Sequence, residues 1–108
     1  MNNSQTIALI FSALAHPLRV DIFKCLLAHY PESMTVGSLS RATDIAPSSL
    51  SHHLRLMEEG NLISRSIDGR KTKLFLEISS LRETIQTLMQ VCCSVDNEDI
   101  SQKVNLNS

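Results

Sequence analysis

The spacing of apolar residues along this chain changes once, near Leu62, from the period of a helix to that of a strand. Upstream, apolar residues recur three and four positions apart, as they do on one face of a helix. Downstream, Ile63 and Ile67 alternate with polar residues, Asp68-Gly69 is a typical hairpin signal, and a second strand is expected over residues 72–76. The pattern predicts a mainly α fold with one small β-hairpin.

Four helices are expected before the hairpin and one after it, in the order α-α-α-α-β-β-α. The first two are separated at His16-Pro17, because proline lacks an amide donor and suits the first turn of a new helix. Thr35 is expected to cap the third helix through its hydroxyl. Gly60-Asn61 should end the fourth, since both residue types tolerate a left-handed backbone. The expected ranges are residues 5–15, 17–29, 36–42, 47–59 and 81–95, with capping-box spacing at Ser80 before the last.

The length of the chain allows one hydrophobic core. With 108 residues, 43% of them hydrophobic, we expect a single domain over residues 5–95. Residues 96–108 are polar and acidic without periodicity and are predicted to form a disordered tail. No stretch resembles an export signal or a membrane span, so a cytoplasmic location is expected. Three cysteines, an odd number, then favour reduced thiols over a disulfide framework.

Positive charge gathers in the middle of the chain although the net charge is only −1. Residues 47–75 carry five basic and three acidic residues, whereas residues 76–108 carry two basic and five acidic ones. The middle is also where two helices, joined by about four residues, precede the hairpin, which is the layout of a winged helix-turn-helix. The wing would be the hairpin, and double-stranded operator DNA would be the partner.

A recognition helix needs short hydrogen-bonding side chains and at least one cation toward the base edges. The exposed side of the helix over residues 47–59 offers Ser48, Ser49, Ser51, His52 and Arg55. The hairpin adds cations that would contact phosphate, namely Arg65, Arg70, Lys71 and Lys73. A serine-rich solvated surface is the competing interpretation, and the turn before the helix and the basic wing after it favour DNA. His53 neighbours the inward side of the helix and is predicted to be a core histidine.

Three segments resemble the signature stretches of the ArsR/SmtB family of metal- and metalloid-responsive repressors. They are Ala13-Leu14-Ala15-His16-Pro17-Leu18-Arg19, Ser51-His52-His53-Leu54-Arg55 and Asp68-Gly69-Arg70. The similarity covers roughly residues 7–93. It implies a homodimer built through the first and last helices, which leaves operator DNA when an effector binds, and no enzymatic activity. The chain also has no paired carboxylates, nucleophile-base set or glycine-rich phosphate loop. It departs from the family at Gly60-Asn61, where Ala-Gly is usual.

The same resemblance limits the kinds of effector that the chain could bind. The Cys-Val-Cys motif of similar arsenite sensors would fall near residues 36–39, where this chain has no cysteine, and the histidines and aspartates of zinc sensors are absent from residues 81–95. Cys92-Cys93 is similar to the cysteine pair of one arsenic-responsive branch. Trivalent arsenic is soft and prefers thiolates. The expected effector is arsenite or methylarsenite bound at these two cysteines, with no other cofactor required. Two thiols suit the methylated form, and inorganic arsenite would need a third ligand from water or Cys25.

Cys25 is the residue on which a second hypothesis for the sensor site depends. Its place on the apolar face of the second helix favours a core residue, because buried free cysteine behaves as a small hydrophobe. Persulfide- and redox-sensing relatives, however, pair a cysteine of the second helix with one near the end of the last. Cys93 is near the matching position, but Cys25 is one residue later than in those relatives, a rotation of about 100° on a helix. A thiol-redox or persulfide sensor that uses Cys25 and Cys93 is therefore the second hypothesis.

Overall fold

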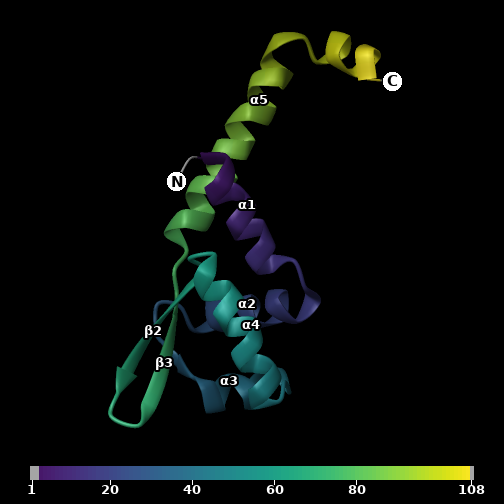
Figure 1. Ribbon diagram of the computed structural model, residues 1–108. Helices are drawn as coiled ribbons and strands as arrows, with labels where there is room; N and C mark the ends of the chain where they lie inside the picture. Colours follow the sequence, from purple (N-terminus) through teal and green to yellow (C-terminus); the bar gives the residue numbers. More distant parts are fainter. Residues whose placement is uncertain (1–2, 108) are drawn as a thin grey trace.

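The computed structural model describes the backbone of residues 3–107 and the side chains of residues 4–94. Five helices and three short strands follow one another in the described part (Figure 1). The bounds are α1 Asn3–Leu14, α2 Pro17–His29, β1 Met34–Thr35, α3 Val36–Thr43, α4 Pro47–Glu59, β2 Ile63–Asp68, β3 Lys71–Leu76 and α5 Ser79–Asn107. The predicted mainly α winged helix-turn-helix is confirmed.

Local signals set the beginnings and ends of the helices. His16 caps α2, where its Nδ1 accepts a hydrogen bond from the Leu18 amide at 3.1 Å. Thr35 caps α3 as predicted, because its Oγ1 accepts a hydrogen bond from the Ser38 amide, and Ser38 Oγ accepts one from the Thr35 amide, which completes a capping box. Asp44 follows α3 in a left-handed conformation with a φ of 60°, which turns the chain toward α4. The capping box predicted at Ser80 is wrong, because α5 begins at Ser79 and Ser80 already lies within its first turn.

The sheet has one strand more than the sequence predicted. Strand β3 lies between β1 and β2, and both neighbours are antiparallel to it. Strand β1 is two residues long, too short for a period-two pattern to be visible, and Met34 pairs with Leu74. The hairpin turn consists of Gly69 and Arg70, one residue later than the sequence signal suggested. Gly69 takes a φ of 65°, which fits the preference for glycine at the first central position of a type II′ turn.

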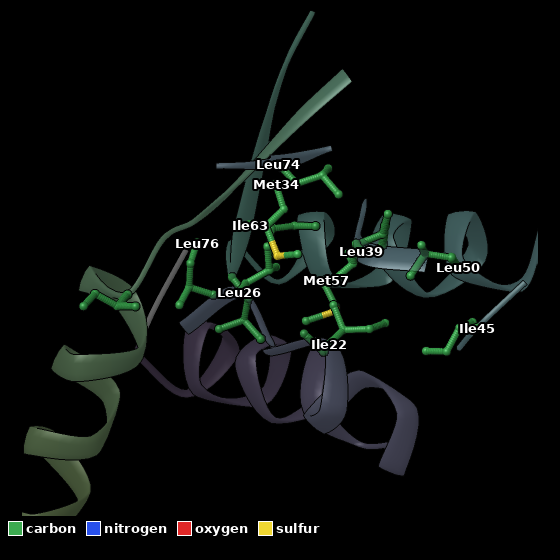
Figure 2. Packing of buried hydrophobic residues seen from close by; sticks show 14 of the residues in the cluster. Ile22, Leu26, Met34, Leu39, Ile45, Leu50, Met57, Ile63, Leu74 and Leu76 are labelled. Carbon is green, nitrogen blue, oxygen red and sulfur yellow. The ribbon is translucent and has the colours of Figure 1, made fainter. Parts of the chain in front are cut away.

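The core lies where α1, α2, α3, α4 and the sheet meet. The side chains that fill it are apolar and almost fully buried, and many of them can be followed in Figure 2. Burial of this kind stabilises the fold by about 25 cal/mol per Å² of apolar surface. It is therefore the main force that holds α4 against the other helices and the sheet. The buried set is Ile10, Ala13, Ile22, Leu26, Met34, Leu39, Ile45, Leu50, Leu54, Met57, Leu62, Ile63, Leu74, Leu76 and Ile78.

Gly60 is required for packing and not for a left-handed backbone. Its φ is −86°, so the prediction of a left-handed conformation holds only for Asn61, with a φ of 59°. A Cβ on Gly60 would lie 2.5 Å from the Ala13 Cβ and 2.8 Å from the Leu9 carbonyl oxygen. Helix α1 therefore lies directly on the end of α4, at a distance that only glycine permits.

Helices α1 and α5 pack against each other (Figure 1). Apolar side chains of both helices remain uncovered in the single chain. These side chains are between one third and three fifths exposed: Leu9 36%, Phe11 47%, Ile85 48%, Met89 58% and Val91 59%. A buried Phe11 would be expected in a monomer with a complete core. The two helices thus leave a set of apolar side chains uncovered, and we call these five residues together the α1/α5 face.

Helix α5 is longer than predicted. Its backbone is helical to Asn107, where the sequence suggested a structureless acidic tail from residue 96, and side chains from residue 95 on lie outside the described set. The boundary between a domain over residues 5–95 and a tail over 96–108 stays a prediction.

Within the described residues, no single helix is long and apolar enough to cross a membrane. Taken together, Ser4–Leu14 and Pro17–His29 have the length and composition of a membrane span, but the two helices are bent by 94° relative to each other.

Candidate nucleic-acid interface

Helix α4 has a buried side and an exposed polar side. Leu50, Leu54 and Met57 are at most 1% exposed and hold the helix on the core, as Figure 2 shows for Leu50 and Met57. On the other side, all five residues predicted as base readers are exposed: Ser48, Ser49, Ser51, His52 and Arg55. Serines near the start of the helix let its backbone approach a surface closely, and each supplies one donor and two acceptor positions.

His52 and Arg55 form one unit on that exposed side. An Arg55 Nη2 hydrogen bond reaches His52 Nδ1 over 3.3 Å. Because a guanidinium can only donate, His52 Nδ1 accepts, and the ring proton of the neutral form lies on Nε2. The contact holds the guanidinium beside the serines and leaves its other N–H groups available for a base or a phosphate.

The wing places its four predicted cations in two different situations. Arg65 is engaged by Glu58 of α4 through two hydrogen bonds, one of them Nε to Oε1 at 2.9 Å, and this bonding raises the pKa of Arg65. Lys73 lies 3.2 Å from Asp68 within the hairpin. Arg70 and Lys71 are exposed at the tip and take part in neither salt bridge. Arg70 and Lys71 are therefore the exposed wing-tip cations that remain available to an anion, whereas Arg65 pairs with Glu58 of α4.

A buried arginine joins α4 to the end of α1. Arg19 of α2 is 9% exposed, and its Nε donates to the Ala13 carbonyl at 3.0 Å and its Nη2 to the Ser12 carbonyl at 3.5 Å. Its Nη1 lies 3.1 Å from His53 Nδ1, which must accept. His53 is 7% exposed, so the prediction of a core histidine is confirmed.

Sequence reasoning did not single out Arg19. The sequence signal that could have pointed to Arg19 is a basic residue on the apolar face of the second helix. Its partners, a histidine 34 positions away and two main-chain carbonyls, leave no mark in the sequence.

Known helix-turn-helix proteins are similar to this chain in sequence and in structure. A model of a helix-turn-helix domain matches residues 14–65. The HTH-type transcriptional regulator YgaV of Escherichia coli (strain K12) is 29% identical over 91 residues, 84% of this chain and 90% of that protein. The transcriptional repressor SdpR of Bacillus subtilis (strain 168) is 26% identical over 89 residues, 82% of this chain and 96% of that protein.

Among solved structures, a homodimeric winged helix-turn-helix DNA-binding domain from Mycobacterium bovis, a possible ArsR-family regulator, matches with a TM-score of 0.66. The match covers 88% of this chain and 84% of that one, at 21% identity. The chain has the winged helix-turn-helix fold. Both curated relatives are regulators of transcription, a non-enzymatic class of protein.

The cysteines of this chain lie in two unlike environments. Cys92 and Cys93 are exposed on α5, so solvent and small effectors reach both. Cys25 is half-buried against the core, and its thiol contacts the Met34 sulfur at 3.7 Å. Burial raises the pKa of Cys25, which lowers the thiolate fraction that redox chemistry and metalloid binding need.

The three cysteines do not form one site in the single chain. Among the described residues, no group of three or more histidine, cysteine, aspartate or glutamate side chains comes together. Helix α5 packs on α1 and extends away from the body that holds α2 (Figure 1). This arrangement supports neither Cys25 as a third arsenite ligand nor a Cys25/Cys93 pair within one protomer.

We expect the protein to lose stability as the pH falls below about 6.5, the ordinary pKa of histidine. Desolvation, then the positive charges of His16, Arg19 and His52, lower the pKa of His53 in the folded protein. The unfolded chain therefore takes up the proton first, and the free energy of unfolding decreases as the pH falls through this range.

Urea unfolding at pH 7.5 and pH 5.0 measures this decrease. His53→Gln should show a smaller decrease than the wild type. The matched control is His29→Gln, which removes an exposed imidazole from α2 and should keep the wild-type decrease. Equal pH dependence in wild type and His53→Gln would show that His53 is not the group responsible.

Proposed function

We propose that this regulator is a homodimeric ArsR-type repressor that acts in the cytoplasm and leaves its operator when trivalent arsenic bridges Cys92 and Cys93. One observation carries the DNA-binding part. The exposed serine, histidine and arginine side chains of α4 lie beside a wing whose tip cations, Arg70 and Lys71, have no salt-bridge partner among the described residues. Base readers and phosphate contacts therefore occur together, as DNA recognition requires.

The α1/α5 face supports a dimer. Five apolar side chains on two packed helices remain exposed in the single chain, and a second copy that covers them would restore ordinary burial. The similar domain from Mycobacterium bovis is described as homodimeric. A twofold dimer presents two copies of α4, so the operator should be roughly palindromic with half-sites about 34–36 Å apart or a multiple of that.

Arsenic binding would act through the shape of α5. Neighbouring residues of a helix point about 100° apart, so Cys92 and Cys93 cannot both face one arsenic atom while the helix is regular. Chelation by both thiolates therefore favours local unwinding of α5, close to Met89 and Val91 of the α1/α5 face. Helix α1 would transmit the change, because it is in contact with α4 at Gly60 and through Arg19.

Two thiolates complete the coordination of methylarsenite, whose methyl group occupies the third valence. Inorganic arsenite would need a ligand from water or from another side chain. Two observations favour the methylated effector: Cys92 and Cys93 are exposed, and no group of three or more histidine, cysteine, aspartate or glutamate side chains comes together among the described residues.

Arg55→Ala should weaken binding to the cognate operator far more than to random DNA. Arg55 projects from the exposed side of α4, and loss of one base contact costs about 1–3 kcal/mol. Lys71→Ala, at the wing tip, should lower affinity for both DNAs and reduce the salt slope by about one unit, because it neutralises a phosphate.

Fluorescence anisotropy at several salt concentrations, with an operator selected from random duplexes, measures both effects. Lys24→Ala, which removes an exposed cation from α2, is the control and should behave as wild type. Equal losses on cognate and random DNA for both Arg55→Ala and Lys71→Ala would contradict the assigned division of roles.

A further inference from the structure

A hollow of 420 Å³ separates the start of α3 from the wing. Residues 35–37 and Arg41 line it on the α3 side, and Arg70, Lys71 and Thr72 line it on the wing side. The hollow thus lies between α3 and the wing, which are far apart in sequence. Both elements are next to α4 (Figure 1).

All the charged side chains that line the hollow are basic. Three of its lining residues carry positive charge, and none of the lining residues is acidic. The two salt bridges among the described residues use Arg65 and Lys73, so Arg41, Arg70 and Lys71 remain without an acidic partner there. Like charges gathered without a counterion repel one another, and an anion that enters the hollow relieves this repulsion.

Arg41 is directed toward the start of its own helix. Its Nη1 lies 3.5 Å from the position that a Cβ on Gly37 would occupy, one helical turn earlier. A guanidinium in this place adds its charge to the positive end of α3. Because Gly37 has no side chain, the guanidinium and the backbone of the first turn face the same space.

We propose that this hollow binds a phosphate of the DNA backbone and that Arg41 is a phosphate-binding residue of the regulator. The inference rests on the proposed DNA-binding function and extends it. If α4 enters the major groove and the wing contacts DNA beyond it, the backbone between the two contacts must pass close to the start of α3. A guanidinium can hold phosphate through two parallel hydrogen bonds, and Lys71 and Arg70 add charge from the wing.

The test compares Arg41→Ala and Arg41→Lys with the wild type and with Lys24→Ala. Because Arg41 is exposed, the folded structure should survive, and urea unfolding checks this. Arg41→Ala should lower affinity roughly tenfold on operator and on unrelated DNA alike, and reduce the salt slope by about one unit. Arg41→Lys should keep the slope and recover part of the affinity. Lys24→Ala should match the wild type.

A set of operators, each with one uncharged methylphosphonate linkage, locates the phosphate. At one position the substitution should weaken wild-type binding by about the same factor as Arg41→Ala, and have little further effect on that variant. Wild-type affinity and salt slope in Arg41→Ala would overturn the inference while the DNA-binding function stands. Failure of the wild type to bind any selected duplex would overturn both.

Discussion

Cys92→Ser and Cys93→Ser should each bind operator as tightly as the wild type and fail to leave it when methylarsenite is added. Neither cysteine lies on α4 or the wing, so DNA affinity should not change. Release should be lost in both variants, because a single thiolate cannot bridge arsenic and a hydroxyl is a poor ligand for a soft ion. Anisotropy of labelled operator during a methylarsenite titration measures both properties in one experiment.

Cys25→Ser is the matched control for that experiment. Its side chain is half-buried beside Met34, so the variant should lose some stability through burial of a hydroxyl, at a cost of about 1–3 kcal/mol. Release by methylarsenite should remain. If Cys25→Ser abolished release while Cys92→Ser did not, the sensor would be the Cys25/Cys93 pair. If inorganic arsenite required all three cysteines, Cys25 would be the third ligand and its assignment to the core would be wrong.

Gly60→Ala should lower the free energy of unfolding by about 1–3 kcal/mol, a large share of the 5–15 kcal/mol that small domains possess. The added methyl group would lie 2.5 Å from the Ala13 Cβ and 2.8 Å from the Leu9 carbonyl oxygen. Neither atom belongs to a flexible side chain, so α1 as a whole must shift. A shift of α1 also displaces the α1/α5 face, and weaker dimerisation should accompany the loss of stability.

Gly37→Ala provides the control for Gly60→Ala. The nearest atom to its added Cβ would be the Arg41 Nη1 at 3.5 Å, an ordinary contact, and Gly37 lies within helix α3. Alanine there should be neutral or stabilise the fold by up to about 1 kcal/mol. Urea unfolding of both variants decides the matter. Equal stability of Gly60→Ala and the wild type would show that α1 does not pack as closely on α4 as the structure indicates.

Sequence reasoning succeeded where the signal was local. Helix α4 spans Pro47–Glu59 as predicted, because proline marks its start and the apolar period continues to its end. The Thr35 cap and the inward histidine, His53, were also predicted, since each follows from its position on a helix. The exposure of the five polar side chains predicted to read DNA follows from the same periodicity.

The features that were missed depend on contacts between distant segments. Glu58 pairs with Arg65 only because the hairpin folds back on α4, and Arg41 lines the same hollow as the wing only because β1 joins the sheet beside β3. Gly60 looked like a helix terminator because the close approach of α1 cannot be read from a single glycine. Tertiary geometry decided each of these cases, and local pattern could not.

We propose above all that trivalent arsenic bound to thiols removes this protein from DNA. The most direct measurement is the anisotropy of operator-bound wild-type protein, titrated in parallel with methylarsenite, arsenite, zinc and polysulfide. Methylarsenite should return the anisotropy to that of free DNA, with arsenite less effective and zinc without effect. Release by polysulfide or zinc with no response to either arsenical would contradict the claim.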